Sequence, residues 1–296
     1  MLSLEPKDLS IPDLHQHLLG AVGPRPIAFV STMNETGQVN LAPYSFFNIF
    51  SVSPPIAIFS PARRGRDNST KHTYENAKVV KECVINIVNH AMVEQMSLAS
   101  TEYAAGVDEF IKAGLTPLPS ELVQPPRVGE SPVQLECKIN EVIELGQTGG
   151  AGNLVICEII KIHIQESVLN ELGKIDPTKM DQVARMGGHW YTRANAGLFQ
   201  LPQPTTKIAI GFDQLPIDVR HSDVLTGNEL AQLASVEHLP DETSVNEYKL
   251  IELSDIFIEL EGQPQALEKA LHMKAKNLLS LKDIEAAWKT LLAFNN

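Results

Sequence analysis

Residues 39–55, VNLAPYSFFNIFSVSPP, combine residue types that could hold a flat ring with polar edges. Prolines and small polar residues interrupt the hydrogen bonding of a strand and favour turns. Such a stretch exposes backbone N–H groups beside an apolar slot, so a ring can stack on side chains while its edge takes backbone donors. A proline-rich corner of a sheet, with Phe46 and Phe47 in the core, would have the same composition, and these residues alone leave both interpretations open.

A second cluster, SPARRGRDNSTKHT (60–73), combines positive charge with hydroxyl groups. Four basic residues less one acid give it +3 in a chain of net charge −12: Arg63, Arg64, Arg66, Lys71 and Asp67. We expect a helix over residues 69–79 with Ser69 or Thr70 as its N-cap, and the free N–H groups of a helix start favour an anion. Arginine forks beside such a start indicate a phosphate site, although a solvated loop with salt bridges has the same composition.

The two clusters lie only one short apolar strand apart, residues 55–60. A ring slot beside a phosphate site favours a nucleotide-like cofactor. Because no GxGxxG follows a predicted strand, a dinucleotide-binding turn is disfavoured. The sequence therefore predicts a mononucleotide cofactor such as FMN.

A third stretch, ARMGGHWYTR (184–193), could cover a ligand. Its glycines permit close backbone approach, and Arg185, His189 and Tyr191 could reach across, but a turn around a core tryptophan would look the same. Glu109 could act as a general base, although an isolated carboxylate is more often solvated. The chain has no GxSxG, P-loop or HExxH, so we predict no catalytic side chain and no metal site.

The elements that position these clusters are mostly short strands. Residues 26–33 and 38–45 are predicted to form a hairpin, and residues 132–146 and 153–169 a longer one. Further strands are expected at 55–60 and 82–88, and a helix at 90–100. Antiparallel strands with short helices between them indicate a mainly β fold, a barrel or a sandwich.

A composition change near residue 204 predicts two domains, 1–204 and 205–296. Residues 205–296 hold only 3 of the 19 prolines, and their 8 basic and 15 acidic residues give a charge of −7. Helical spacing dominates there, with a capped helix at 226–235 and a helical hairpin broken at Ser280. We expect the apolar stripe of that hairpin to pack on the barrel or on a partner subunit.

Composition also limits partners and location. The net charge of −12 disfavours binding to nucleic acid or to an anionic membrane, and no apolar run is long enough to span a bilayer. Cys83, Cys137 and Cys157 each lie in an apolar, strand-like run, as expected for reduced core thiols. With no signal peptide pattern at the start, the sequence predicts a cytoplasmic protein.

Taken together, these stretches resemble one family. GPRPIAFVST (23–32), GQVNLAPYSFFNIFSVSPP (37–55), KHTYEN (71–76), VDEFIKAGL (107–115), ESPVQLECKI (130–139) and RMGGHWY (185–191) are similar to the flavin reductase-like, FMN-binding split-barrel family. The resemblance covers roughly residues 15–204. It departs at His72, where the family has an acid, and at Cys157, where it has glycine.

The resemblance implies a split β-barrel with short helices, followed by a C-terminal helical extension of unassigned role. It assigns the isoalloxazine ring to Asn40, Ala42, Pro43, Tyr44 and Ser45, with Phe46, Phe47 and Asn48 supporting the ring and the ribityl chain. It assigns the phosphate to Ser60, Arg63, Lys71 and Thr73, and places Arg185, His189 and Tyr191 near the flavin or the nicotinamide.

The function implied is an NAD(P)H-dependent flavin reductase, a homodimer in which hydride passes from nicotinamide C4 to flavin N5. NADH or NADPH is the co-substrate, and an electron-acceptor protein is a further expected partner. Two alternatives stay open: an electron carrier that holds FMN tightly without catalysing its reduction, and an interaction protein that kept the barrel and lost flavin.

Overall fold

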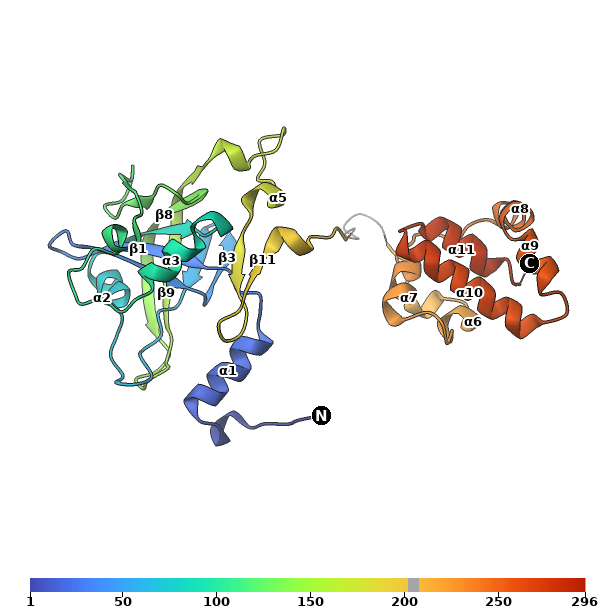
Figure 1. The fold of residues 1–296 in the computed structure, drawn as a ribbon, viewed down its shortest axis with the longest axis horizontal. Helices are drawn as coiled ribbons and strands as arrows, with labels where there is room; N and C mark the ends of the chain where they lie inside the picture. Colours follow the sequence, from blue (N-terminus) through green and yellow to red (C-terminus); the bar gives the residue numbers. More distant parts are fainter. Residues whose placement is uncertain (202–207, 296) are drawn as a thin grey trace. The chain divides into compact units, whose positions relative to one another are not determined.

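The computed structural model describes residues 1–201 and 208–295 and divides into two compact units, Met1–Phe199 and Gln200–Asn296 (Figure 1). Each unit has hydrophobic clusters of its own. The domain boundary expected between residues 204 and 205 lies outside the described residues. Across the described ranges, no helix has both the length and the apolar character needed to cross a membrane.

One seven-stranded antiparallel sheet forms the centre of the first unit, in the order β2-β1-β5-β8-β9-β4-β3. Its strands are β1 (Ala28–Met33), β2 (Val39–Tyr44), β3 (Phe47–Val52), β4 (Pro55–Phe59), β5 (Glu82–Ile87), β8 (Val133–Glu144) and β9 (Asn153–Ile164). Two short ribbons, β6 (Pro117–Leu118) with β7 (Arg127–Val128) and β10 (Val183–Arg185) with β11 (Tyr191–Arg193), lie outside this sheet. Both expected hairpins are confirmed.

The sheet curls because its two edge strands follow each other in the chain. β2 and β3 lie at opposite ends of the strand order, yet only Ser45 and Phe46 separate them. The sheet must therefore turn back until its edges meet at this corner, where the Ser60 N–H donates to the Phe46 carbonyl at 2.9 Å. Residues 39–55 therefore form the two edge strands β2 and β3, with Ser45 and Phe46 as the corner between them.

Alternation along β1 buries both faces of the strand. Ala28 and Val30 belong to the cluster that also contains Phe59 from β4, whereas Ile27 and Phe29 pack into a second cluster with Leu41. The second cluster also includes side chains of the short helices over β2. A strand that is covered on both faces has a nearly continuous apolar sequence, as residues 26–33 do.

Five α-helices are described in the first unit: α1 (Ile11–Ala21), α2 (His72–Val79), α3 (Val93–Ala99), α4 (Glu109–Ala113) and α5 (Pro177–Met180). The sequence placed the start of α2 wrongly. Lys71 is its N-cap, without a side-chain cap. Ser69 Oγ instead accepts from Arg64, and the Thr70 hydroxyl bonds Glu75, so neither hydroxyl was available for the cap.

The three cysteines are buried, free thiols on adjacent strands, as expected. Cys83 faces Cys137 in the β5–β8 register, and its sulfur lies 3.7 Å from that of Cys157. Cys157, where the resembling family has glycine, packs in the barrel interior. The substitution therefore fills core volume.

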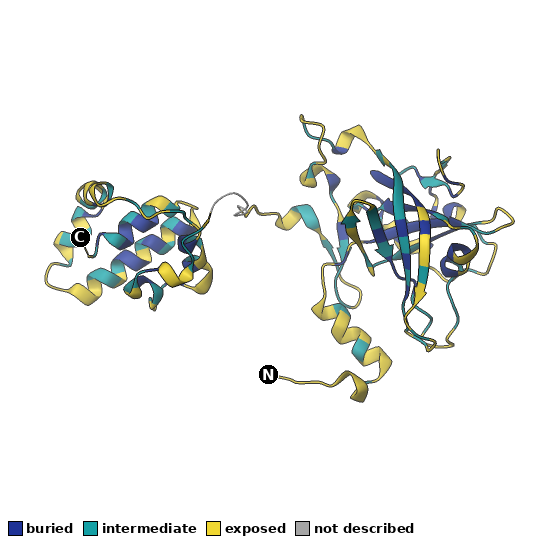
Figure 2. Cartoon of the chain, turned by 180° about the vertical axis from the view of Figure 1, so that it is seen from behind, coloured by how far each residue is buried: buried dark blue, intermediate teal, exposed yellow. Residues whose placement is uncertain are grey.

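The second unit is helical, with α6 (Ile217–Arg220), α7 (Gly227–Ala234), α8 (Glu242–Glu252), α9 (Ser254–Glu259), α10 (Pro264–Ser280) and α11 (Ile284–Leu292). Thr226 caps α7 through a complete capping box, and the expected break after Ser280 is confirmed. The buried side chains of α10 and α11 face the interior of this unit (Figure 2). Trp288 is fully buried there, and its indole N–H donates to Leu233.

This arrangement corrects one expectation. The apolar stripe of the helical hairpin packs within its own unit, on side chains of α6 and α7, a neighbour that the expectation did not name. The sequence pattern shows that a helix needs an apolar neighbour but does not say which one.

Candidate functional site

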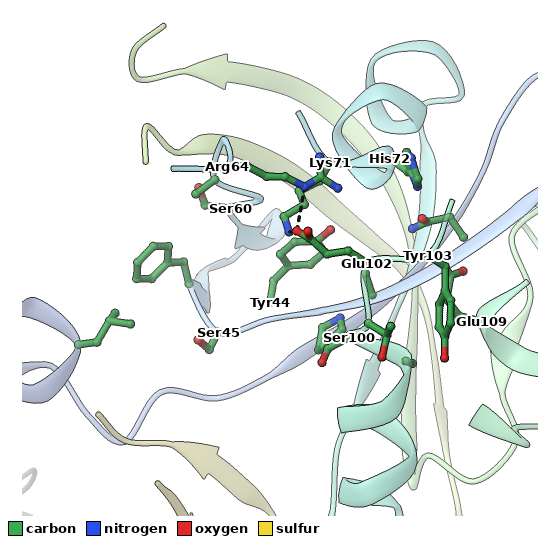
Figure 3. A pocket seen from close by; sticks show the side chains of 18 of the residues that line it. Tyr44, Ser45, Ser60, Arg64, Lys71, His72, Ser100, Glu102, Tyr103 and Glu109 are labelled. Carbon is green, nitrogen blue, oxygen red and sulfur yellow. Dashed lines mark hydrogen bonds and ion pairs between the residues drawn. The ribbon is translucent and has the colours of Figure 1, made fainter. Parts of the chain in front are cut away.

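A cavity of about 240 Å³ opens beside the barrel corner (Figure 3). Three segments line most of it. The strand wall consists of Asn40, Ala42, Pro43, Tyr44, Ser45 and Phe46; the cation wall consists of Ser60, Ala62, Arg64, Lys71 and His72; and the third side is formed by Ala99 and residues 100–103 of the α3–α4 loop. Glu109 of α4 and His15 and Leu19 of α1 complete the lining.

The strand wall is one continuous piece of chain. Asn40 is nearly buried, and its amide donates to the Thr73 hydroxyl at 2.8 Å. The Tyr44 ring stacks on Phe59 with centroids 5.5 Å apart, which fixes an aromatic side chain at the pocket. No residue of this wall carries a charge at neutral pH, and burial raises the pKa of Tyr44 further above its usual value.

The cation wall gathers two positive groups and a hydroxyl from separate turns of chain. Arg64 is held by Ser69, at 3.0 Å, and by the Thr70 carbonyl. Lys71 stands at the N-cap of α2, and Ser60 accepts the backbone N–H of Asn153 at 3.0 Å. The guanidinium and the ammonium are therefore presented side by side at a helix start, as an anion site requires.

Arg63, which the resemblance assigned to the phosphate, does not line this pocket. Successive side chains of an extended segment point to opposite sides, and residues 61–64 have no helix or turn. Arg63 Nε donates to Asn68 at 2.8 Å, and its backbone pairs with Gly150 and Ala151 in the β8–β9 turn. Arg64 takes the place expected for Arg63.

The α3–α4 loop, residues 100–108, brings an acid to the cation wall. Glu102 Oε1 lies 2.8 Å from Arg64 Nε and 3.0 Å from Lys71 Nζ, and Figure 3 shows these contacts as dashed lines. Hydrogen bonds from Lys71 and Arg64 lower the pKa of Glu102 to about 2. The carboxylate is therefore charged throughout the neutral range.

Glu109 lies buried at the base of the pocket. Its carboxylate accepts the Leu41 backbone N–H at 3.0 Å, which ties the first turn of α4 to β2. Burial raises the pKa of Glu109. The sequence offered a solvated carboxylate or a general base, and the geometry instead gives Glu109 a part in holding the strand wall in place.

Eight of the residues named from the sequence meet at this cavity: Asn40, Ala42, Pro43, Tyr44, Ser45, Phe46, Ser60 and Lys71. Seven described residues that the resemblance assigned are not part of its lining: Phe47, Asn48, Arg63, Thr73, Arg185, His189 and Tyr191. Thr73 is fully buried directly behind Asn40, whereas Asn48 is exposed on β3.

The stretch 184–193 forms a small hairpin of its own. Arg185 donates to the Tyr191 hydroxyl and the Gly188 carbonyl, both at 2.8 Å, and its guanidinium lies over the Tyr191 ring. His189 is exposed in the turn. At Gly187 a Cβ would stand 3.1 Å from Gly20, so this glycine serves the contact with α1.

A buried arginine ties that hairpin to α1. Arg25 Nη1 donates to the Leu19 carbonyl at 2.6 Å and to the Val22 carbonyl, and Nη2 donates to the Met186 carbonyl. None of the eleven residues of α1 is buried. The guanidinium of Arg25 therefore holds the last turn of α1, the helix that contributes His15 and Leu19 to the pocket.

Sequence reasoning missed the lining residues from α1, from residues 99–103 and at Ala62, and it named Arg64 and His72 without assigning either a contact. Arg64 and His72 had a signal, since both lie in the basic cluster. Glu102 had none, because its cationic partners are 38 and 31 residues away in the chain. Among the residues that the structure describes, no group of three or more His, Cys, Asp or Glu is placed to hold a metal ion.

Comparison with known proteins identifies the family. The model of the flavin reductase like domain matches residues 21–179, more than half of the chain. The chain therefore belongs to the flavin reductase-like family, as the sequence motifs predicted.

The relatives are matched over almost their whole length, and this chain over about two thirds of its own. An uncharacterised protein of Halalkalibacterium halodurans is 35% identical over 206 residues, which cover 69% of this chain and 97% of that protein. Nitrilotriacetate monooxygenase component B from Bacillus cereus is 31% identical, with a TM-score of 0.64, over 68% of this chain and 98% of that one. A Shewanella frigidimarina structure described as a flavin reductase with a split barrel domain is 26% identical, with a TM-score of 0.58, over 67% and 96% of the two chains. The mainly β, split-barrel fold expected from the sequence is thus confirmed.

Proposed function

We propose that the protein binds FMN in the pocket at the barrel corner and reduces it with NADH or NADPH. The observation that carries this proposal is the meeting of an uncharged wall containing Tyr44 with the paired cations Arg64 and Lys71 in one cavity. A flat ring and a single phosphate are the two groups that such a pair of walls suits. Family membership supports the same ligand.

The strand wall would hold the ring. Ala42 and Pro43 offer apolar surface, Tyr44 is fixed by its stack on Phe59, and the Asn40 amide is oriented by Thr73. The corner residues Ser45 and Phe46 interrupt the ladder, as a site with polar ring edges requires. Thr73 would act through Asn40 and not by direct contact, because it is fully buried.

The cation wall would hold the phosphate through Arg64, Lys71 and Ser60. The chemistry of this donor set fits the group, since Arg64 and Lys71 already bind a carboxylate in the structure. His72, at the first position of α2, lies beside them. We keep Arg63 out of this assignment because it faces the β8–β9 turn.

Bound FMN would supply the redox chemistry, with nicotinamide C4 as hydride donor and flavin N5 as acceptor. The protein needs no acid or base for such a transfer. Its residues would orient the ring against the strand wall, anchor the phosphate and keep the two reactants within reach. Arg185, His189 and Tyr191 stay as predicted contacts for the flavin or the nicotinamide, on a hairpin that adjoins α1 through Gly187.

We propose a homodimer formed through β3. This edge strand exposes Ile49, Phe50 and Val52, with 47%, 65% and 86% of their surfaces accessible. Unpaired edges with apolar side chains are covered in most soluble proteins. Asn48, on the same strand, would then lie at the interface, and an electron-acceptor protein remains the further proposed partner, a role consistent with the component B name of one structural relative.

The test is direct. The purified chain is titrated with FMN by fluorescence quenching, and the complex is mixed anaerobically with NADH or NADPH while the 450 nm absorbance is followed. Binding with bleaching supports the reductase. Binding without bleaching by either nucleotide, but with reduction by dithionite, supports the electron carrier. Absence of FMN binding would leave the barrel as an interaction module and overturn the proposal.

A further inference from the structure

Glu102 lies where the proposed phosphate ligands meet. One of its oxygens contacts Arg64 and Lys71, at 2.8 and 3.0 Å, and the other lies 2.5 Å from Arg66 Nη2. Figure 3 shows the carboxylate pointing at the cation wall from the α3–α4 loop. A carboxylate held by several cationic donors meets the same requirements of charge and geometry as a phosphate.

The positive charge of the cation wall is too small to balance both the Glu102 carboxylate and a bound phosphate. Arg64, Lys71 and Arg66 carry +3. Glu102, together with Asp67, which pairs with Arg66, reduces the sum to +1. A phosphate monoester carries about −1.5 to −2 near pH 7. If Glu102 stayed in place, the phosphate would share its donors with another anion, and two negative groups in contact repel each other.

The carboxylate can leave without disturbing the core. Thr101, Glu102, Ala104, Ala105 and Gly106 are all exposed. The buried anchors of the loop are Ala99 at the end of α3 and Glu109 and Phe110 at the start of α4. A rotation of the Glu102 side chain into solvent therefore breaks ion pairs only.

We propose that Glu102 occupies the phosphate position between Arg64 and Lys71 and is displaced when a phosphorylated flavin binds, so that it lowers the affinity for FMN specifically. The inference rests on the proposed function and deepens it. An internal competitor makes the flavin exchange with solvent, which suits a diffusible substrate better than a permanently held group. The presence of Glu102 thus lowers the affinity for FMN. It also makes the difference in affinity between FMN and riboflavin smaller than Arg64 and Lys71 alone would give.

The test compares FMN with riboflavin, which has the same ring and no phosphate. Glu102→Gln keeps the size of the side chain and removes its charge. We expect FMN to bind roughly tenfold more tightly to this variant, the equivalent of one favourable charge interaction regained, while the riboflavin affinity stays within about twofold. The gain should shrink in 1 M salt, because exposed charges are screened there. Glu171→Gln, the same change at an exposed residue outside the pocket, is the matched control and should alter neither affinity.

Inorganic phosphate provides a second measurement that does not need flavin. Calorimetric titration should show tighter phosphate binding to Glu102→Gln than to the unaltered chain. If Glu102→Gln weakens FMN binding or leaves it unchanged, Glu102 only orients the cations and the inference is wrong. If neither flavin binds to any variant, the proposed function itself fails, so the two failures are distinguishable.

Discussion

The strand wall and the cation wall of the pocket are built in opposite ways. The strand wall is one run of chain, residues 40–46, whose geometry follows from the β1–β2 ladder. The cation wall and the α3–α4 loop that faces it collect single residues from positions 60 to 103, joined by ion pairs at the surface. A rigid sheet edge thus faces a wall whose charges can exchange partners, and the two should respond differently to substitution.

The sharpest contrast is within the cation wall. Arg64→Ala removes the guanidinium that contacts Glu102 and faces the pocket, and a hydrogen bond to a charged group contributes about 1.5–3 kcal/mol. We expect FMN affinity to fall by about a hundredfold at the upper end of that range, with riboflavin binding little changed. Arg63→Ala, one residue away, is the control and should leave both affinities unaltered in the same fluorescence titration. An equal loss for both arginines would contradict the alternation of side chains described for residues 61–64.

A substitution that disturbs the strand wall should weaken the binding of both flavins and not of FMN alone. Thr73→Val keeps the shape of a buried residue and removes the acceptor of the Asn40 amide. An unsatisfied buried donor costs about 1–3 kcal/mol, so we expect lower stability and a loss of about tenfold in affinity for FMN and riboflavin alike. Thr32→Val is the matched control, because Asn76 donates to Thr32 in a similar buried pair outside the pocket lining. It should lower the free energy of unfolding without changing flavin affinity; a change that affects FMN alone in Thr73→Val would refute the ring assignment.

A smaller effect is expected at Lys71. Its ammonium is about a third exposed, and exposed charge pairs contribute up to about 1 kcal/mol. Lys71→Ala should therefore weaken FMN binding by about fivefold and leave riboflavin unaffected. Lys78→Ala, on the same helix but paired with Glu144, provides the control. Greater loss at Lys71 than at Arg64 would reverse the order of the two cations.

The smallest effect concerns pH. The folded-state pKa of Glu102 is lowered to about 2 by Lys71 and Arg64, so the ion pairs stabilise the folded chain above the ordinary glutamate pKa and this contribution is lost as pH falls toward 2. We expect the small stability difference between the unaltered chain and Glu102→Gln to be constant from pH 5 to 8 and to shrink only below about pH 4.5. Chemical denaturation at several pH values measures it. A difference that changes between pH 6 and 8 would show that another group controls this loop.

The same contrast explains how much the sequence could predict. Local patterns determine the hairpins β1–β2 and β8–β9, so periodicity and turn residues were sufficient, and the strand wall followed because it is contiguous. The choice between Arg63 and Arg64 depends on which side of an extended segment faces the pocket. The types of the neighbouring residues do not determine that side. The contacts of Glu102 could not be predicted from local sequence, because its partners lie 31 or more residues away in the chain and only folding brings them together.

The attachment of α1 to the rest of the first unit depends largely on one side chain. The helix contributes His15 and Leu19 to the pocket, buries none of its own residues, and is held at its last turn by Arg25. Movement of α1 away from the opening therefore breaks a few hydrogen bonds of one guanidinium and disrupts no hydrophobic core. A substitution at Arg25 would therefore alter the attachment of α1 without changing any residue of the pocket lining.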